Sequence, residues 1–238
     1  MQFVWQGVRQ AVHLILHGDD GVWQITWVTL RVAFYSTAIA LAIGLPLGVW
    51  LGLGRFRGRR AGMTLSNAGI GLPPVVVGVV LVVLMFPTGP LGSLHLLYTL
   101  KGVVIAQTVL ALPLVVALTS AAVQLVSRGL LAQARAFGAS TWQVWLLAVR
   151  EARVGVFAAA IAAVGSAFSE VGAVILVGGN IEGQTQTLAS AALQRVDAGD
   201  FSGGIAMGLI LLGLILVVAA LLTIAQQRGA RVGARPPS

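Results

Sequence analysis

Five long apolar stretches dominate this sequence and leave few folds open to it. They cover residues 24–54, 61–87, 98–126, 154–178 and 203–226. A helix needs about 20 consecutive apolar residues to cross a bilayer core of roughly 30 Å, and each stretch reaches that length. The chain is 58% hydrophobic and 9% charged, with a mean hydropathy of +0.94. The sequence therefore predicts an all-α integral membrane protein with about five transmembrane helices.

The positive charge of the chain is concentrated in a few short regions. A formal net charge of +8 and a pI near 11.6 also occur in proteins that bind nucleic acid. The arginines, however, gather in segments 55–60 and 128–153 and in a basic tail, 227–238. The opposite loops hold Asp19, Asp20, Glu182, Arg195, Asp197 and Asp200. Since basic loops remain in the cytoplasm, the charge indicates topology and requires no nucleic-acid partner.

We therefore expect a multi-pass protein of a bacterial or archaeal cytoplasmic membrane, with its N-terminus outside and its C-terminal tail inside. Residues 1–20 differ from the spans because apolar and polar residues alternate with helical periodicity. This pattern predicts an N-terminal amphipathic helix that lies in the interface and contacts membrane lipid. His13 and His17 have a spacing that can bind a metal ion, but a solvated polar face is the favoured interpretation. We predict no metal site and no cofactor.

The segment 128–153 predicts two short helices in the cytoplasm. Gly138 follows a helical pattern over 129–137, as a glycine at a helix C-terminus does. Ser140 precedes Gln143 by three residues, which is the spacing of a capping box that begins a second helix. On that helix the apolar residues Trp142, Trp145, Leu146 and Val149 form one ridge. Two hypotheses remain open: an amphipathic loop on the lipid headgroups, or a docking site for a cytoplasmic partner.

Two features interrupt the apolar spans. Pro73 and Pro74 break the second stretch, which indicates either a gate segment or an ordinary kink. Glu170 is the one acidic residue inside a span, where a charge costs about 2.5–3.5 kcal/mol on insertion scales. It lies near a translocation path or it locks helices together, and the second role is favoured.

Motifs for catalysis are missing from the sequence. The single lysine, Lys101, is followed by Gly102 and Val103, so the phosphate-binding loop of an ATPase is absent. The chain also lacks the H-E-x-x-H and G-x-S-x-G motifs. We predict that the protein is not an enzyme and that any ATP hydrolysis belongs to a separate subunit.

Four runs of sequence carry a resemblance to a known family. ARAFGASTWQVWLLAVREARVGV, residues 134–156, resembles the EAA loop of binding-protein-dependent ABC importer permeases. GLPLG at 44–48, GLPPVVVG at 71–78 and FSEVGAVILVGGN at 168–180 are similar to the molybdate/tungstate branch, tungstate permeases above all. The resemblance implies the type I ABC importer permease fold over residues 24–226, with a cytoplasmic coupling loop at 128–153.

The resemblance also implies partners and site residues. The partners are an ATP-binding subunit dimer, an extracytoplasmic solute-binding protein and a second permease copy in a homodimer. The coupling residues implied for the ATPase contact are Ala136, Gly138, Ala139, Ser140, Trp142, Trp145, Arg150 and Glu151. The candidate pore or gate residues are Pro73, Pro74, Ser169, Glu170 and Gly172. Three positions depart from the family pattern: Gln133, Arg150 and Ser166 stand where an acid, a proline and an arginine are frequent.

The expected function is import of tungstate or molybdate. Hydroxyl groups in the spans can solvate an oxyanion, although bonding to the helix's own backbone is their commoner role. The hydroxyls concerned are those of Thr29, Ser36, Thr37, Ser166 and Ser169. The alternatives are an ABC permease for a different solute, a secondary transporter and a membrane scaffold. A secondary transporter is expected to show repeats and several intramembrane ionisable residues, and this sequence shows neither.

Overall fold

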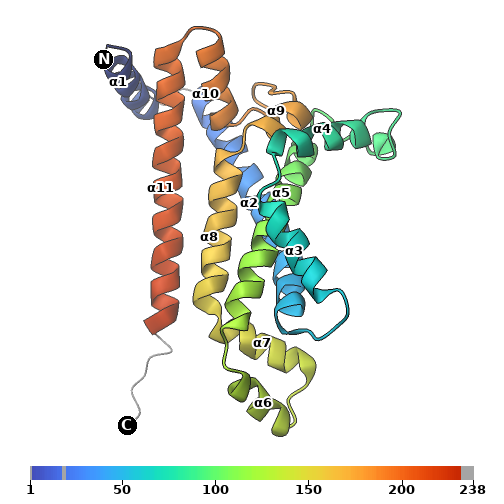
Figure 1. Cartoon of the computed structure of the whole chain (residues 1–238). Coiled ribbons are helices and arrows are strands. Elements are labelled where there is room, and N and C mark those ends of the chain that lie inside the picture. Colours follow the sequence, from blue (N-terminus) through green and yellow to red (C-terminus); the bar gives the residue numbers. More distant parts are fainter. Residues whose placement is uncertain (1, 18–19, 232–238) are drawn as a thin grey trace.

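The computed structural model describes residues 2–17 and 20–231, and over these ranges the fold consists of helices joined by turns and loops (Figure 1). The described residues contain no strand, which confirms the predicted all-α class. The helices are α1 (Gln2–His17), α2 (Asp20–Leu53), α3 (Arg59–Ile70), α4 (Pro74–Met85), η1 (Gly92–Leu94), α5 (Leu100–Gln124), α6 (Arg128–Ala136), α7 (Thr141–Glu151), α8 (Arg153–Ser169), α9 (Gly172–Gly178), α10 (Leu188–Asp197) and α11 (Phe201–Arg231).

Three helices, α2, α5 and α11, are long and apolar enough to cross a membrane. Helices α2 and α5 pack along each other because glycines on α2 allow close approach. A Cβ atom added to Gly48 would lie 2.6 Å from Cβ of Thr119, and one added to Gly44 would lie 2.7 Å from Cγ1 of Val115. Small residues at such spacing are the usual means of packing transmembrane helices. Helices α3, α8 and α9 pack against α5 of this pair.

The two remaining predicted spans are not continuous helices: the predicted break at Pro73 and Pro74 is confirmed, and a second break, after Ser169, was not predicted. Over 61–87 the chain forms α3 and α4, which are bent by 103° at the break before Pro74. Proline lacks a backbone N–H and restricts the residue before it, which ends α3. Over 154–178, α8 ends at Ser169 and α9 begins at Gly172. The second bent pair is α7 and α8, at 74°, and the predicted total of about five spans is reached when each of the pairs α3–α4 and α7–α8 counts as one span.

The loop 54–58 between α2 and α3 and the turn between α6 and α7 lie at one end of the molecule (Figure 1). We call this the basic end, because the arginines of segments 55–60 and 128–153 gather there. Helices α9 and α10 and the beginning of α11 lie at the opposite end. Two of the predicted basic regions are therefore adjacent in space, while the tail 232–238 lies outside the described residues.

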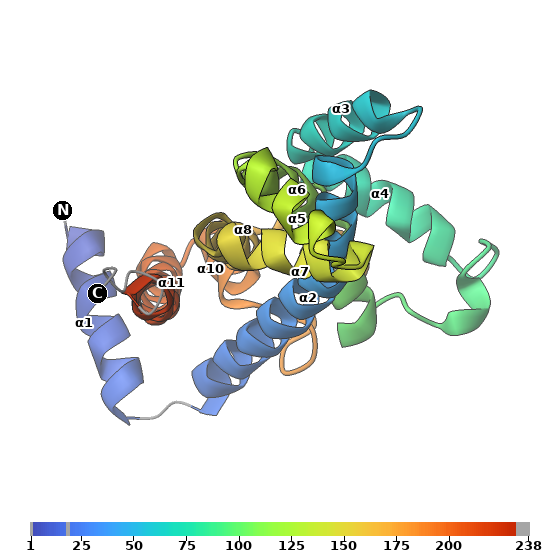
Figure 2. The same ribbon diagram turned by 90° about the horizontal axis from the view of Figure 1, so that it is seen from below.

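Helix α1 confirms the predicted N-terminal helix and packs against α11 at the edge of the molecule (Figures 1 and 2). A Cβ atom added to Gly7 would lie 2.5 Å from Cγ2 of Ile205, so the two helices touch closely. Val4, Trp5 and Val12 remain exposed, as suits a helix that also meets lipid. The side chain of His17, which has metal-ligand spacing to His13 but was expected on a solvated polar face, lies outside the described residues.

Candidate functional site

The turn between α6 and α7 has the local geometry that the sequence predicts. Gly138 adopts a left-handed φ of 86°. Its N–H donates to the carbonyl of Arg135 at 3.0 Å, and the N–H of Ala139 donates to that of Ala134 at 3.0 Å. This hydrogen-bond pattern is a Schellman motif. The capping box follows: N–H of Gln143 donates to Oγ of Ser140 at 3.4 Å, and N–H of Ser140 donates to Oε1 of Gln143 at 2.7 Å.

The turn exposes a large aromatic side chain that the sequence analysis missed. Phe137 is 92% exposed, immediately before Gly138. Ala136, Gly138 and Ser140 are exposed beside it. The opposite faces of α6 and α7 are buried on each other through Leu131, Val144 and Ala148. The position of Phe137 in the sequence could have predicted this exposure. An aromatic residue directly before a glycine that ends a helix lies in the turn, where its side chain cannot reach the face between α6 and α7.

The predicted ridge on α7 lies beside α2. Trp145 and Val149 pack over a buried cluster that contains Val49 of α2. Trp142 is 66% exposed and Leu146 is 58% exposed, and both border a groove beside Leu45. Arg150 borders the same region, whereas Glu151 is exposed at the end of α7. The eight predicted coupling residues therefore form two groups, one at the turn and one on α7.

A basic pocket lies next to the turn. Its volume is about 370 Å³, and Arg55, Arg59, Arg128 and Arg135 line it together with the ends of α2 and α5. Arg59 donates from Nε to the carbonyl of Leu51 at 2.7 Å and from a terminal nitrogen to that of Gly52 at 3.0 Å. These bonds satisfy carbonyls at the C-terminus of α2. The other three arginines have no ion-pair partner within the described part of the chain.

The structure brings the two broken spans together. Helix α4 begins at Pro74, after Pro73, and α9 begins at Gly172, after Glu170. A Cβ atom added to Gly172 would lie 2.8 Å from Cγ2 of Val75, and one added to Gly78 would lie 3.0 Å from Cα of Ala173. The candidate gate residues thus meet at one place although about 100 residues of chain separate them. Nothing in their local patterns predicts this contact.

Glu170 has a structural partner at this place. Its Oε1 atom accepts a hydrogen bond of 3.0 Å from the backbone N–H of Ala173, in the first turn of α9. A carboxylate that satisfies a free N–H at a helix N-terminus stabilises that terminus. This contact agrees with the favoured structural role of the carboxyl group.

The hydroxyl groups proposed to solvate an anion mostly bond to their own helices. Oγ of Ser169 donates to the carbonyl of Gly165 at 3.0 Å, and Oγ1 of Thr29 donates to that of Ile25 at 2.8 Å. Ser36 donates in the same way to Val32 at 2.7 Å. Such bonds are the ordinary fate of hydroxyls in a helix, and they weaken the proposal that these groups bind substrate.

The sequence analysis also missed Gln107, which is buried in the middle of α5. Its Nε2 atom donates to the carbonyl of Ala167 at 3.0 Å. That carbonyl lies in the last turn of α8, where the helix leaves its acceptors without partners of their own. Gln107 therefore stabilises the end of α8 at the break that follows Ser169. Its polar amide inside an otherwise apolar span could have identified it from the sequence.

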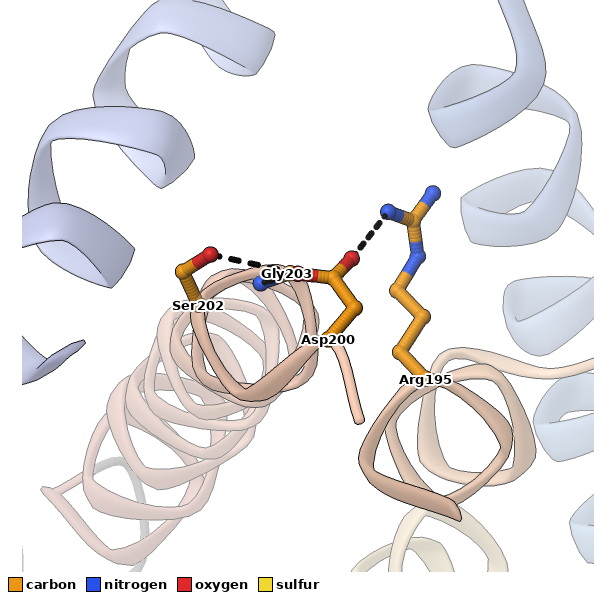
Figure 3. Close-up of polar contacts among 4 residues, drawn as sticks. All are labelled: Arg195, Asp200, Ser202 and Gly203. Carbon is orange, nitrogen blue, oxygen red and sulfur yellow. Dashed lines mark hydrogen bonds and ion pairs between the residues drawn. The ribbon is translucent and has the colours of Figure 1, made fainter. Parts of the chain in front are cut away.

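Asp200 anchors the opposite end of the molecule, before α11 (Figure 3). Its carboxylate accepts hydrogen bonds from the N–H of Gly203 at 2.9 Å and from Oγ of Ser202 at 3.1 Å. It also forms an ion pair with Arg195 at 3.2 Å. The backbone hydrogen bond from Gly203 is the main cause that lowers the pKa of Asp200 below its ordinary value of 3.8. The carboxylate therefore caps α11 and joins it to α10.

Comparison with known proteins identifies the family of this chain. The family described as "Binding-protein-dependent transport system inner membrane component" matches residues 44–231. The chain belongs to this family. It is 40% identical over 218 residues to a probable anion ABC transporter permease protein of Haloferax volcanii, covering 90% of this chain and 91% of that protein. It is 33% identical over 222 residues to the tungstate uptake system permease protein TupB of Peptoclostridium acidaminophilum, covering 93% and 97%.

A solved structure supports the expected fold. A chain of an inward-facing structure of the MetNI methionine ABC transporter superposes with a TM-score of 0.65 at 24% identity, covering 91% of this chain and 95% of that chain. The permease has the type I ABC importer permease fold. It is a multi-pass membrane subunit of a binding-protein-dependent importer that works with ATP-binding subunits, and it belongs to the transport components of such systems. The secondary-transporter and scaffold hypotheses are wrong.

Proposed function

We propose that the permease imports a tetrahedral oxyanion, with tungstate preferred over molybdate and sulfate a distant third. The observation that carries this proposal is the similarity along nearly the whole chain to permeases for anions and for tungstate. The spans support it weakly, because they contain few acidic groups that would repel an anion. The pore is formed by two copies of the permease, and a separate extracytoplasmic binding protein delivers the solute to the end that carries α9 and α10.

The test is ATPase stimulation in proteoliposomes. The permease is reconstituted with its ATP-binding subunit and its binding protein, which is loaded with tungstate, molybdate or sulfate. We expect stimulation in that order. Stimulation by a binding protein loaded only with an amino acid, a sugar or a metal cation would contradict the substrate but not the permease function.

Contact with the ATP-binding subunit is proposed at the α6–α7 turn. Ala136, Gly138, Ala139 and Ser140 form this turn, and Phe137 projects from it as an aromatic anchor that is 92% exposed. Aromatic side chains that leave water on binding contribute much of the energy of an interface. The turn is also rigid, since a Schellman motif and a capping box hold both sides of it, so little conformational entropy is lost on docking.

The basic pocket beside the turn favours a partner with an acidic surface. Its four arginines lie within one cavity of about 370 Å³, next to α6. Complementary charge raises the association rate and makes it depend on salt. We therefore expect assembly with the ATP-binding subunit to be faster at low ionic strength, and Arg128→Gln with Arg135→Gln to reduce this salt dependence in surface plasmon resonance measurements.

The gate is proposed where α4 and α9 meet. Both helices follow a break in a span, and breaks in a membrane are tolerated where the backbone is covered by protein or faces a watery path. Pro73, Pro74 and Gly172 position the two helices, and Glu170 and Ser169 fix the second break through bonds to backbone groups. Separation of α4 from α9 would open the path.

A further inference from the structure

An apolar groove runs along α2 where α7 meets α8. The two helices are bent by 74° relative to each other, so α7 lies across the basic end while α8 runs along the molecule (Figure 1). Two adjoining cavities of about 510 and 160 Å³ form the groove and share Leu45, Leu146 and Val149. We call it the α2–α7–α8 groove.

The groove has a distinct charge and side-chain pattern. Its wall toward the middle of the molecule is apolar, with Leu41 on α2 and Phe157 on α8. At the basic end Arg150 and Arg153 line it, one from each side of the bend. Trp142 and Trp145 line its other part, on α7. No carboxylate lines either cavity, and Arg150 forms no ion pair within the described ranges 2–17 and 20–231.

We infer that the α2–α7–α8 groove binds one anionic phospholipid of the leaflet at the basic end. Its acyl chain lies against Leu41 and Phe157, and its phosphate is bound by Arg150 and Arg153. Arginine binds phosphate oxygens through two parallel N–H bonds, and tryptophan prefers the level of the headgroups. A free phosphate ion would leave the apolar wall uncovered.

The test uses fluorescence quenching in the assembled transporter. The permease and its ATP-binding subunit are reconstituted into nanodiscs with brominated phosphatidylglycerol or brominated phosphatidylcholine at equal mole fraction. The fluorescence of Trp142 and Trp145 is obtained by subtracting the tryptophan fluorescence of the Trp142→Phe/Trp145→Phe variant from that of the native protein. We expect this signal to be quenched by the anionic lipid at a lower mole fraction than by the zwitterionic lipid.

The arginines should account for that preference. Since a basic residue near an anionic leaflet contributes about 1 kcal/mol, removal of each should reduce the preference about fivefold. Arg150→Gln/Arg153→Gln should abolish it, and Arg150→Lys/Arg153→Lys should keep most of it and shows whether the fold is intact. Arg57→Gln/Arg60→Gln is the control, since it removes the same charge from two exposed positions at the same end, one in the loop before α3 and one in its first turn.

Three outcomes would overturn the inference. Equal quenching by both lipids in the native protein would mean that only bulk lipid covers the groove. Absence of quenching by either lipid would mean that protein covers it, either a second copy or the ATP-binding subunit. An equal loss of preference in the Arg57/Arg60 control would mean that the effect is a general surface charge.

Discussion

Gly138 holds the α6–α7 turn in a backbone conformation that costs a residue with a side chain about 1–2 kcal/mol. Its φ is 86° and an added Cβ would meet no atom within 4 Å, so the strain comes from the backbone alone. We predict that Gly138→Val leaves the permease in the membrane but prevents co-purification of the ATP-binding subunit. Gly138→Asn should retain it, because asparagine tolerates this conformation.

The control for this prediction is Gly199→Val. Gly199 has a φ of 82° and equally open surroundings, but it lies before α11 at the opposite end. It should strain the backbone by a similar amount and keep the ATP-binding subunit. Normal assembly and transport in Gly138→Val would mean that the turn does not couple the subunits.

Substitutions of Glu170 can distinguish a role in capping α9 from a role as a charged residue of the gate. The amide oxygen of glutamine can accept the same hydrogen bond from the N–H of Ala173 that the carboxylate now accepts at 3.0 Å. We therefore predict that Glu170→Gln transports at a rate close to that of the native protein. Glu170→Ala should lose about 1 kcal/mol of stability, the usual value of a helix cap, and should transport more slowly. Slow transport by the glutamine variant at native thermal stability would argue for the charge itself.

At the scale of elements, the packing of α4 on α9 depends on Gly78. A Cβ atom there would lie 3.0 Å from Cα of Ala173, a backbone atom that cannot move aside alone. We predict that Gly78→Ala destabilises the permease by about 1–3 kcal/mol and slows transport, while the ATP-binding subunit still binds. Gly165→Ala is the matched control, since an added Cβ in α8 would meet nothing within 4 Å. Equal effects of the two variants would contradict the prediction.

The connection of α10 to α11 depends on pH through Asp200. Because folding lowers the pKa of Asp200 below 3.8, its contribution is complete above that value and is lost as the pH falls through the folded pKa. Thermal unfolding in detergent, measured from about pH 6 down to about pH 3, should show a smaller decrease for Asp200→Asn than for the native protein. Asp197→Asn, which removes an exposed carboxylate next to the same turn, should behave like the native protein.

For the whole molecule, the arrangement of charge predicts the orientation in the membrane. Arg57 lies in the loop at the basic end, and Ser93 lies in η1 beyond α4. The chain contains no cysteine, so no native thiol contributes to the labelling of a single cysteine introduced at either position. We predict that Arg57→Cys reacts with an impermeant maleimide only after the cells are opened and that Ser93→Cys reacts in intact cells. Reaction of position 57 from outside would reverse the topology.

Local features of this permease could be predicted from the sequence because each depends on neighbouring residues. The long apolar stretches determine helices, Gly138 ends one helix, and Ser140 begins the next through a hydrogen bond to Gln143. The double proline was visible as an interruption, but the 103° bend at that point was not. The family signature was also local, since it consists of short runs of sequence.

Contacts between distant segments were decided only by the tertiary structure. The approach of Gly172 to Val75, the bond from Gln107 to Ala167 and the direction of the ridge on α7 all join parts of the chain that are far apart in sequence. In a chain this apolar, most helices have apolar residues on several faces. The periodicity of the sequence therefore does not determine which face of a helix packs against which neighbouring helix. The choice depends on the fit of small residues against backbone and on which buried polar groups find partners, and both are fixed only when all the helices are packed together.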